Sequence, residues 1–128
     1  MEKKAIFPAD GSKPIGPYSP IIQFGDLIFV SGQIGFDASQ NKIPEGITAQ
    51  TKAAMTNIQA LLTAAGCTFQ EILQTTVYLA EIADFTAFNE VYQAFFQEPY
   101  PSRATVAVKA LPRGALIEIS AIAGKSRL

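Results

Sequence analysis

Two spacings of apolar residues alternate along the 128 residues of this chain, and each change of spacing marks a new structural element. Apolar residues three and four positions apart predict one helix over residues 46–65 and a second that begins at Asp84 and stops before Pro99. Runs rich in apolar and β-branched residues predict strands at 3–7, 21–24, 27–34, 75–79, 103–110 and 115–123. The predicted order is therefore βββαβαββ.

Turn and cap residues separate these elements. Residues 9–20 hold three prolines and two glycines and are predicted to form a loop. Gly25-Asp26 is a turn signal between two strands, Gly66 is suited to end the first helix, and Thr68 to Glu71 resembles a capping box. The chain contains neither an internal repeat nor a linker, so we expect one domain spanning residues 1–128.

The predicted elements fit an α+β fold in which two amphipathic helices pack on one face of a mixed sheet. The aromatic stripe of the second helix is interpreted as core packing. The last two strands, however, are apolar on both faces, with Ile117 and Ile119 on one side and Leu116 and Ile122 on the other. Two helices cover only one face, so the second face is expected to pack against another copy of the chain. A homo-oligomer is therefore predicted.

Polar residues interrupt these last two strands. Glu118 lies in the middle of an otherwise apolar run, where an uncompensated carboxylate is costly to desolvate. Alternation places Arg103 and Thr105 on one face of their strand and Glu118 and Ser120 on one face of theirs. If the turn between the strands has even length, both pairs face the neighbouring copy. That arrangement fits a small polar pocket, or an interface salt bridge between Arg103 and Glu118 without any chemistry.

Composition narrows the classes of function. Net charge is −1 and the basic residues are not clustered, so nucleic acid and anionic membranes are poor partners. The chain has no histidine and one cysteine, Cys67, which excludes an internal disulfide and disfavours a metal site. We expect no metal and no cofactor. No signal peptide and no apolar stretch long enough to span a membrane is visible, so a cytoplasmic location is expected.

Six short motifs in a fixed order resemble the reactive intermediate deaminase family (Rid, also called RidA or YjgF-like), and the resemblance covers essentially the whole chain. The motifs are Gly16-Pro-Tyr-Ser19, Val30-Ser-Gly-Gln-Ile34, Thr76-Val-Tyr-Leu79, Phe88-Asn-Glu-Val-Tyr92, Pro101-Ser-Arg-Ala104 and Leu116-Ile-Glu-Ile-Ser-Ala-Ile122. The resemblance implies a chorismate-mutase-like fold and a homotrimer with ligand sites between subunits. It also implies a cofactor-independent 2-iminobutanoate/2-iminopropanoate deaminase. Such an enzyme hydrolyses 2-aminoacrylate and 2-aminocrotonate, released by pyridoxal-phosphate enzymes, to 2-oxoacids and ammonia.

The same resemblance implies roles for individual residues. Arg103 would bind the substrate carboxylate, and Glu118 would orient the attacking water and carry a proton. The other substrate-binding candidates are Tyr18, Ser31, Gly32, Asn89 and Thr105. Four of these have plainer alternatives: Tyr18 as a loop anchor, Ser31 as an interface hydroxyl, Gly32 as a bulge glycine and Asn89 as a partner of nearby backbone.

One departure and one alternative function accompany this assignment. Many members of the deaminase branch have cysteine two residues after the arginine, where this chain has Thr105, so a thiol-dependent role is excluded. The alternative is a non-catalytic regulator or chaperone-like protein that binds small 2-oxo or amino acids in the same pocket. An RNA-cleaving role fits worst, because an acidic chain without histidine lacks both phosphate steering and the usual acid–base pair.

Overall fold

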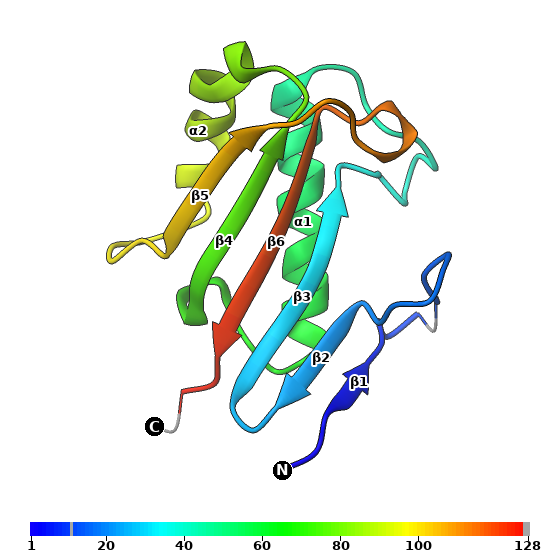
Figure 1. The fold of residues 1–128 in the computed structure, drawn as a ribbon, viewed down its shortest axis with the longest axis vertical. Coiled ribbons are helices and arrows are strands. Elements are labelled where there is room, and N and C mark those ends of the chain that lie inside the picture. The colour runs from blue at the N-terminus through cyan, green and yellow to red at the C-terminus, as the bar shows by residue number, and fades with distance from the viewer. Residues whose placement is uncertain (11, 127–128) are drawn as a thin grey trace.

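The computed structural model describes residues 1–10 and 12–126 and consists of a six-stranded sheet with two helices (Figure 1). The strands are β1 Lys4–Ile6, β2 Ile21–Phe24, β3 Leu27–Ile34, β4 Ile72–Leu79, β5 Ser102–Ala107 and β6 Ile117–Gly124. The helices are α1 Ile47–Ala64 and α2 Phe85–Gln93. The predicted order of elements is confirmed. The described residues of the predicted loop 9–20 contain no helix or strand, and residue 11 of that loop lies outside the described residues.

The sheet has the order β1-β2-β3-β6-β4-β5. All neighbours are antiparallel except β4 and β5, which are parallel because α2 carries the chain back before β5 begins. The condition considered above, a turn of even length between the last two strands, does not apply, because β4 lies between them in the sheet. The segment that joins β5 to β6 therefore crosses over the end of β4. Its length does not determine which face of β5 corresponds to which face of β6.

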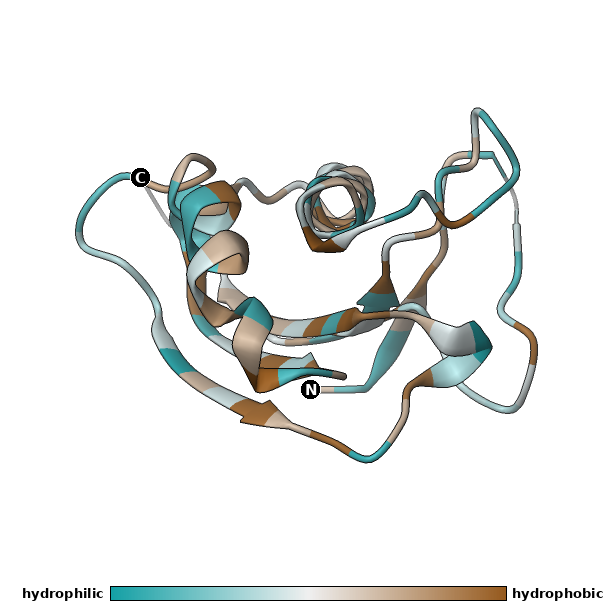
Figure 2. Cartoon of the chain, turned by 90° about the horizontal axis from the view of Figure 1, so that it is seen from above, coloured by the Kyte–Doolittle hydropathy of each residue, from teal (hydrophilic) through white to brown (hydrophobic). Residues whose placement is uncertain are grey.

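Both helices pack on one side of the sheet, as Figure 2 shows from above. The core fills the space between the helices and that face of the sheet. Buried residues alternate along β6, where Ile117, Ile119, Ala121 and Ala123 point toward the helices. From α2 the buried aromatic side chains are Phe88 and Tyr92, and Phe96 follows just after the helix. The core interpretation of the aromatic stripe is confirmed for these three residues, whereas Phe85 is exposed.

A buried amide fixes the start of α1 to the start of β6. The side chain of Gln50 donates to the carbonyl of Pro44 at 2.9 Å and accepts from the backbone N–H of Leu116 at 2.8 Å. Gly35 leaves the room for this contact, because a Cβ at that position would lie 2.8 Å from the Cα of Gln50. The strand that carries Glu118 is thus held at the residue just before its start.

The other face of the sheet carries no helix and is largely apolar. Leu27 and Phe29 of β3 are 40% and 39% exposed, and Val106 of β5 is 45% exposed on the same face. This observation bears out the expectation that both faces of the sheet are apolar. In the part of the chain that the structure describes, no helix is long and apolar enough to cross a membrane.

Candidate functional site

Arg103 lies on β5 and reaches toward α2. Its Cα is paired with that of Thr75 on β4, so it shares the helix-covered face of the sheet with that buried threonine. The guanidinium carbon lies 5.6 Å from the ring centre of Phe85, 5.1 Å from that of Phe88 and 4.9 Å from that of Tyr92. The guanidinium therefore lies over the faces of these rings. Arg103 is at the edge of the sheet, because β5 is an edge strand.

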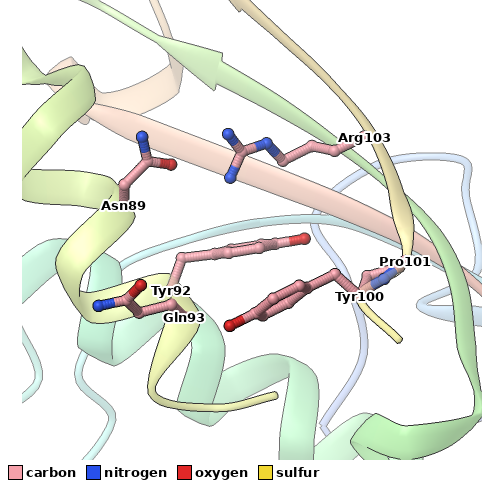
Figure 3. Close-up of a pocket in the computed structure, with 6 residues that line it drawn as sticks. All are labelled: Asn89, Tyr92, Gln93, Tyr100, Pro101 and Arg103. Atoms are coloured by element: carbon pink, nitrogen blue, oxygen red, sulfur yellow. The ribbon is translucent and has the colours of Figure 1, made fainter. Parts of the chain in front are cut away.

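A hollow of about 390 Å³ opens beside Arg103 (Figure 3). Its lining residues come from α2, from the segment before β5 and from β5 itself: Asn89, Tyr92, Gln93, Tyr100, Pro101 and Arg103. In Figure 3 the guanidinium points toward Asn89 across this space. No ion pair joins Arg103 to an acidic residue within the described ranges, so its N–H groups are available to an external carboxylate. We call these six residues the arginine hollow.

Glu118 lies at the centre of β6, on the opposite side of the sheet. Its Cα partners are Tyr78 of β4 and Ile34 of β3. A bulge between Val30 and Gln33 brings Gly32 under the Glu118 side chain, and a Cβ on Gly32 would lie 2.8 Å from the carboxyl carbon Cδ. Gly32 thus lies in the bulge, next to Ser31, and makes room for the carboxyl group. We call Glu118, Gly32 and Ser31 the carboxylate face.

Burial raises the pKa of the Glu118 carboxyl above its ordinary value, and the structure gives no opposing cause. A raised pKa means that the folded chain keeps this proton at pH values where the unfolded chain has lost it. Stability therefore falls as pH rises from the ordinary carboxyl pKa through that of folded Glu118, and is flat above it.

We accordingly expect Glu118→Gln to raise the thermal unfolding midpoint at pH 7.5, because it removes a half-buried charge while preserving shape. The gain should shrink toward zero near pH 3, well below the ordinary carboxyl pKa, where the carboxyl is protonated in both states. Scanning calorimetry of both proteins at the two pH values measures this difference. A lower midpoint for the variant at pH 7.5 would mean that the ionised Glu118 has a favourable partner.

Arg103 and Glu118 do not share a face of the sheet, so this part of the sequence interpretation is wrong. The register of β4 aligns Thr75 with Arg103 and Tyr78 with Glu118, and residues three apart on one strand point to opposite faces. Thr105 follows Arg103 on the helix-covered face, and Ser120 follows Glu118 on the other. One chain therefore brings the arginine and the carboxylate to two separate surfaces.

Ser31 joins the carboxylate face to the loop that carries Tyr18. The hydroxyl of Ser31 donates to the carbonyl of Ser19 at 2.6 Å, and the Ser31 N–H donates to the carbonyl of Pro20 at 2.9 Å. Ser31 thus holds the end of the loop that carries Tyr18. Tyr18 itself is 55% exposed, and its backbone N–H donates to the carbonyl of Gly16. Its side chain is free to reach toward a ligand or a neighbouring copy.

The remaining predicted residues lie on the arginine side. Asn89 lines the arginine hollow with Arg103, whereas Thr105 lies two residues farther along β5, beside Val77. The Thr105 hydroxyl is buried and has no hydrogen-bond partner within residues 1–10 and 12–126. Sequence reasoning missed Tyr92, Gln93 and Tyr100 as lining residues. The available signal was helical spacing, since Asn89, Tyr92 and Gln93 are three and four residues apart.

No group of three or more His, Cys, Asp or Glu side chains in the described part of the chain is placed to hold a metal ion. The polar groups at hand are a guanidinium, a carboxyl of raised pKa, amides and hydroxyls. Such a set can bind a small carboxylate and move a proton.

Comparison with known proteins gives consistent matches. A model of the family described as endoribonuclease L-PSP matches residues 9–125. A RutC family protein of Pyrococcus abyssi is 45% identical over 126 residues, which cover 98% of this chain and 99% of that protein. A 2-iminobutanoate/2-iminopropanoate deaminase of Capra hircus is 44% identical over 124 residues, which cover 96% of this chain and 90% of that protein.

The structural comparison agrees with the sequence comparison. The crystal structure of E. coli TdcF with bound serine has a TM-score of 0.89 and 36% sequence identity, and the match covers 96% of this chain and 99% of that one. The predicted fold class, a mixed sheet with two helices on one face, is confirmed.

Proposed function

Because the chain belongs to the endoribonuclease L-PSP family, whose matched relatives include 2-iminobutanoate/2-iminopropanoate deaminases, we propose that it hydrolyses small 2-imino acids to 2-oxoacids and ammonia. The predicted membership of the Rid family is confirmed by the same matches. The observation that carries the proposed activity is Arg103, a cation without an acidic partner in the described residues, which lines a hollow large enough for a small acid. The serine bound by E. coli TdcF is a carboxylate of suitable size.

The proposed site needs residues from two copies of the chain. Arg103 and Glu118 lie on opposite faces of the sheet, so they can act on one substrate only if the arginine hollow of one copy meets the carboxylate face of another. The exposed apolar residues Leu27, Phe29 and Val106 on the helix-free face favour burial against such a copy. A closed ring satisfies both requirements, since every interface then repeats the same pair of surfaces. We propose a homotrimer with sites at its interfaces.

The chemistry follows from the two charged groups. Arg103 would hold the substrate carboxylate through two parallel N–H donors and thereby fix the neighbouring imine carbon. Glu118, as the carboxylate, would accept a proton from water while the water oxygen bonds to that carbon and the C=N π electrons move to nitrogen. Protonated Glu118 would then return a proton to the nitrogen. The resulting carbinolamine would lose its hydroxyl proton to Glu118, which passes it to the nitrogen. The C–N bond then breaks as the oxygen electrons form the C=O bond, so one imine and one water give one 2-oxoacid and one ammonia.

The direct test couples the purified protein to a threonine dehydratase, which releases 2-aminocrotonate. We expect 2-oxobutanoate to appear faster than in a reaction without the protein, in proportion to the amount of protein added. Heat-denatured protein and serum albumin are the controls. A rate equal to that of spontaneous hydrolysis would contradict the proposed activity.

A binding role without catalysis uses the same arginine hollow and is separated by a second measurement. Calorimetric titration with 2-oxobutanoate that gives saturable binding, in a protein without effect on imine hydrolysis, would favour a regulator that binds small acids. RNA cleavage, which the family's description names, is disfavoured by the net charge of −1 and the absence of histidine. Incubation with a structureless RNA under the same conditions tests it.

A further inference from the structure

We propose that Tyr92, held by Thr75, is a positioning residue that fixes the guanidinium of Arg103 so that its N–H edge faces a bound carboxylate. The inference rests on the proposed function, since it assigns Arg103 the substrate carboxylate. It concerns a residue that lines the arginine hollow and is also part of the core.

The ring of Tyr92 is held on several sides. Tyr92 is only 4% exposed, and its hydroxyl is 2.8 Å from the hydroxyl oxygen of Thr75, which is 2% exposed. Its ring packs against that of Phe88 at 5.2 Å and that of Phe96 at 4.8 Å between centres. A buried hydroxyl pair and two ring contacts leave this side chain little freedom.

Thr75, which anchors the Tyr92 hydroxyl, and Arg103 lie side by side on neighbouring strands of the sheet. Thr75 and Arg103 are Cα partners on the parallel strands β4 and β5 and point to the same face. The hydrogen bond to Thr75 therefore holds the Tyr92 ring beside the Arg103 side chain, whose guanidinium carbon lies 4.9 Å from the ring centre. The Tyr92 hydroxyl is thus held by Thr75 on β4, and the Tyr92 ring contacts Arg103 on the neighbouring strand β5.

This geometry separates the two surfaces of the guanidinium. A ring attracts a cation through its face, whereas hydrogen bonds to a carboxylate leave through the edge in the guanidinium plane. Contacts with the rings of Phe85, Phe88 and Tyr92 thus restrict the side chain through the ring faces. The Tyr92 hydroxyl also accepts from the guanidinium, which leaves the other N–H donors for a carboxylate. An arginine ordered before binding loses less conformational entropy when the ligand arrives.

Plain core packing is the competing explanation, and Phe69 provides the matched control. Phe69 is 8% exposed and packs against Phe95 and Phe96, but no ring contact joins it to Tyr92 or Arg103 in the described structure. Loss of either ring should lower the unfolding midpoint. Only the loss of Tyr92 should change the position of the Arg103 guanidinium and the binding of a carboxylate to it.

The binding test measures the Kd of 2-oxobutanoate by calorimetry in a double-mutant cycle. We expect Tyr92→Leu to weaken binding about tenfold, the scale of a well-formed cation–π contact, and Tyr92→Phe about threefold. In an Arg103→Ala background the same substitutions should change the Kd by less than about twofold. Phe69→Leu should leave the Kd of the otherwise unchanged protein within about twofold. Equal weakening by Tyr92→Leu with and without Arg103, or none in either, would overturn the inference.

A second readout does not depend on ligand binding. In proton NMR of the protein without ligand, the Arg103 side-chain signals should be shifted upfield by the ring currents of α2. Tyr92→Phe keeps the fold and the ring and should reduce this shift, while Phe69→Leu should not. If the protein neither binds 2-oxobutanoate nor hydrolyses imines, the proposed function fails and this shift alone decides the inference. An unshifted Arg103 signal would overturn it.

Discussion

Replacement of Arg103 by alanine is expected to lower kcat/KM for 2-iminobutanoate by about two to three orders of magnitude, the combined scale of two charge-assisted hydrogen bonds. Arg103 lines the arginine hollow without an acidic partner in the described residues, so its charge is not needed to neutralise a neighbour. The loss should therefore come from the substrate and not from unfolding. Steady-state kinetics and a thermal melt of the same sample separate these two effects.

Two further variants sharpen this prediction. Arg103→Lys keeps the charge but not the planar fork, and should still lose about tenfold or more in kcat/KM. Lys109→Ala removes an exposed cation a few residues farther along the chain and should keep wild-type kinetics. If Arg103→Lys is fully active, a bidentate grip is not required. If Arg103→Ala is fully active, the site lies elsewhere.

The second large effect is expected for Glu118→Gln, which should lower kcat by about two to four orders of magnitude while changing KM little. Glutamine has nearly the shape of glutamate and fits above Gly32, so the loss reflects the missing proton acceptor. Glu45→Gln, at an exposed loop carboxylate, is the matched control and should leave kcat unchanged.

The pH dependence gives the same residue an independent signature. In the proposed mechanism the carboxylate is the active form, so kcat/KM should rise with pH through the Glu118 pKa, which burial places above the ordinary carboxyl value. The acid limb of the profile should be absent from the residual activity of Glu118→Gln. A limb that persists unchanged in the variant would assign it to another group.

Local pattern was sufficient for the elements and for the faces of single strands. The spacing of Ile47, Ile58 and Leu62 predicted α1, and alternation in β6 correctly separated Glu118 from Ile117 and Ile119. The apolar character of both sheet faces was also readable, because each strand reports its own two sides. These features depend only on residues that are close to one another in the sequence.

The relation between Arg103 and Glu118 depends on pairing between distant strands and could not be read in this way. Insertion of β4 between β5 and β6 decides which face of one strand corresponds to which face of the other, and it follows from the path of the chain through α2. Tyr92 was hidden for a related reason. Its place in an aromatic stripe predicts core, and only the approach of β5 adds a contact with Arg103.

The central claim is that Arg103 of one copy and Glu118 of another form one site, and mixing two inactive variants tests it most directly. Arg103→Ala and Glu118→Gln proteins are unfolded together in equal amounts, refolded and assayed against each variant treated alone. If subunits assort at random in a ring, about one quarter of the interfaces combine an intact arginine with an intact glutamate, so about one quarter of wild-type activity should return. A mixture no more active than its separate components, in assemblies shown by mass spectrometry to contain both chains, would contradict the claim.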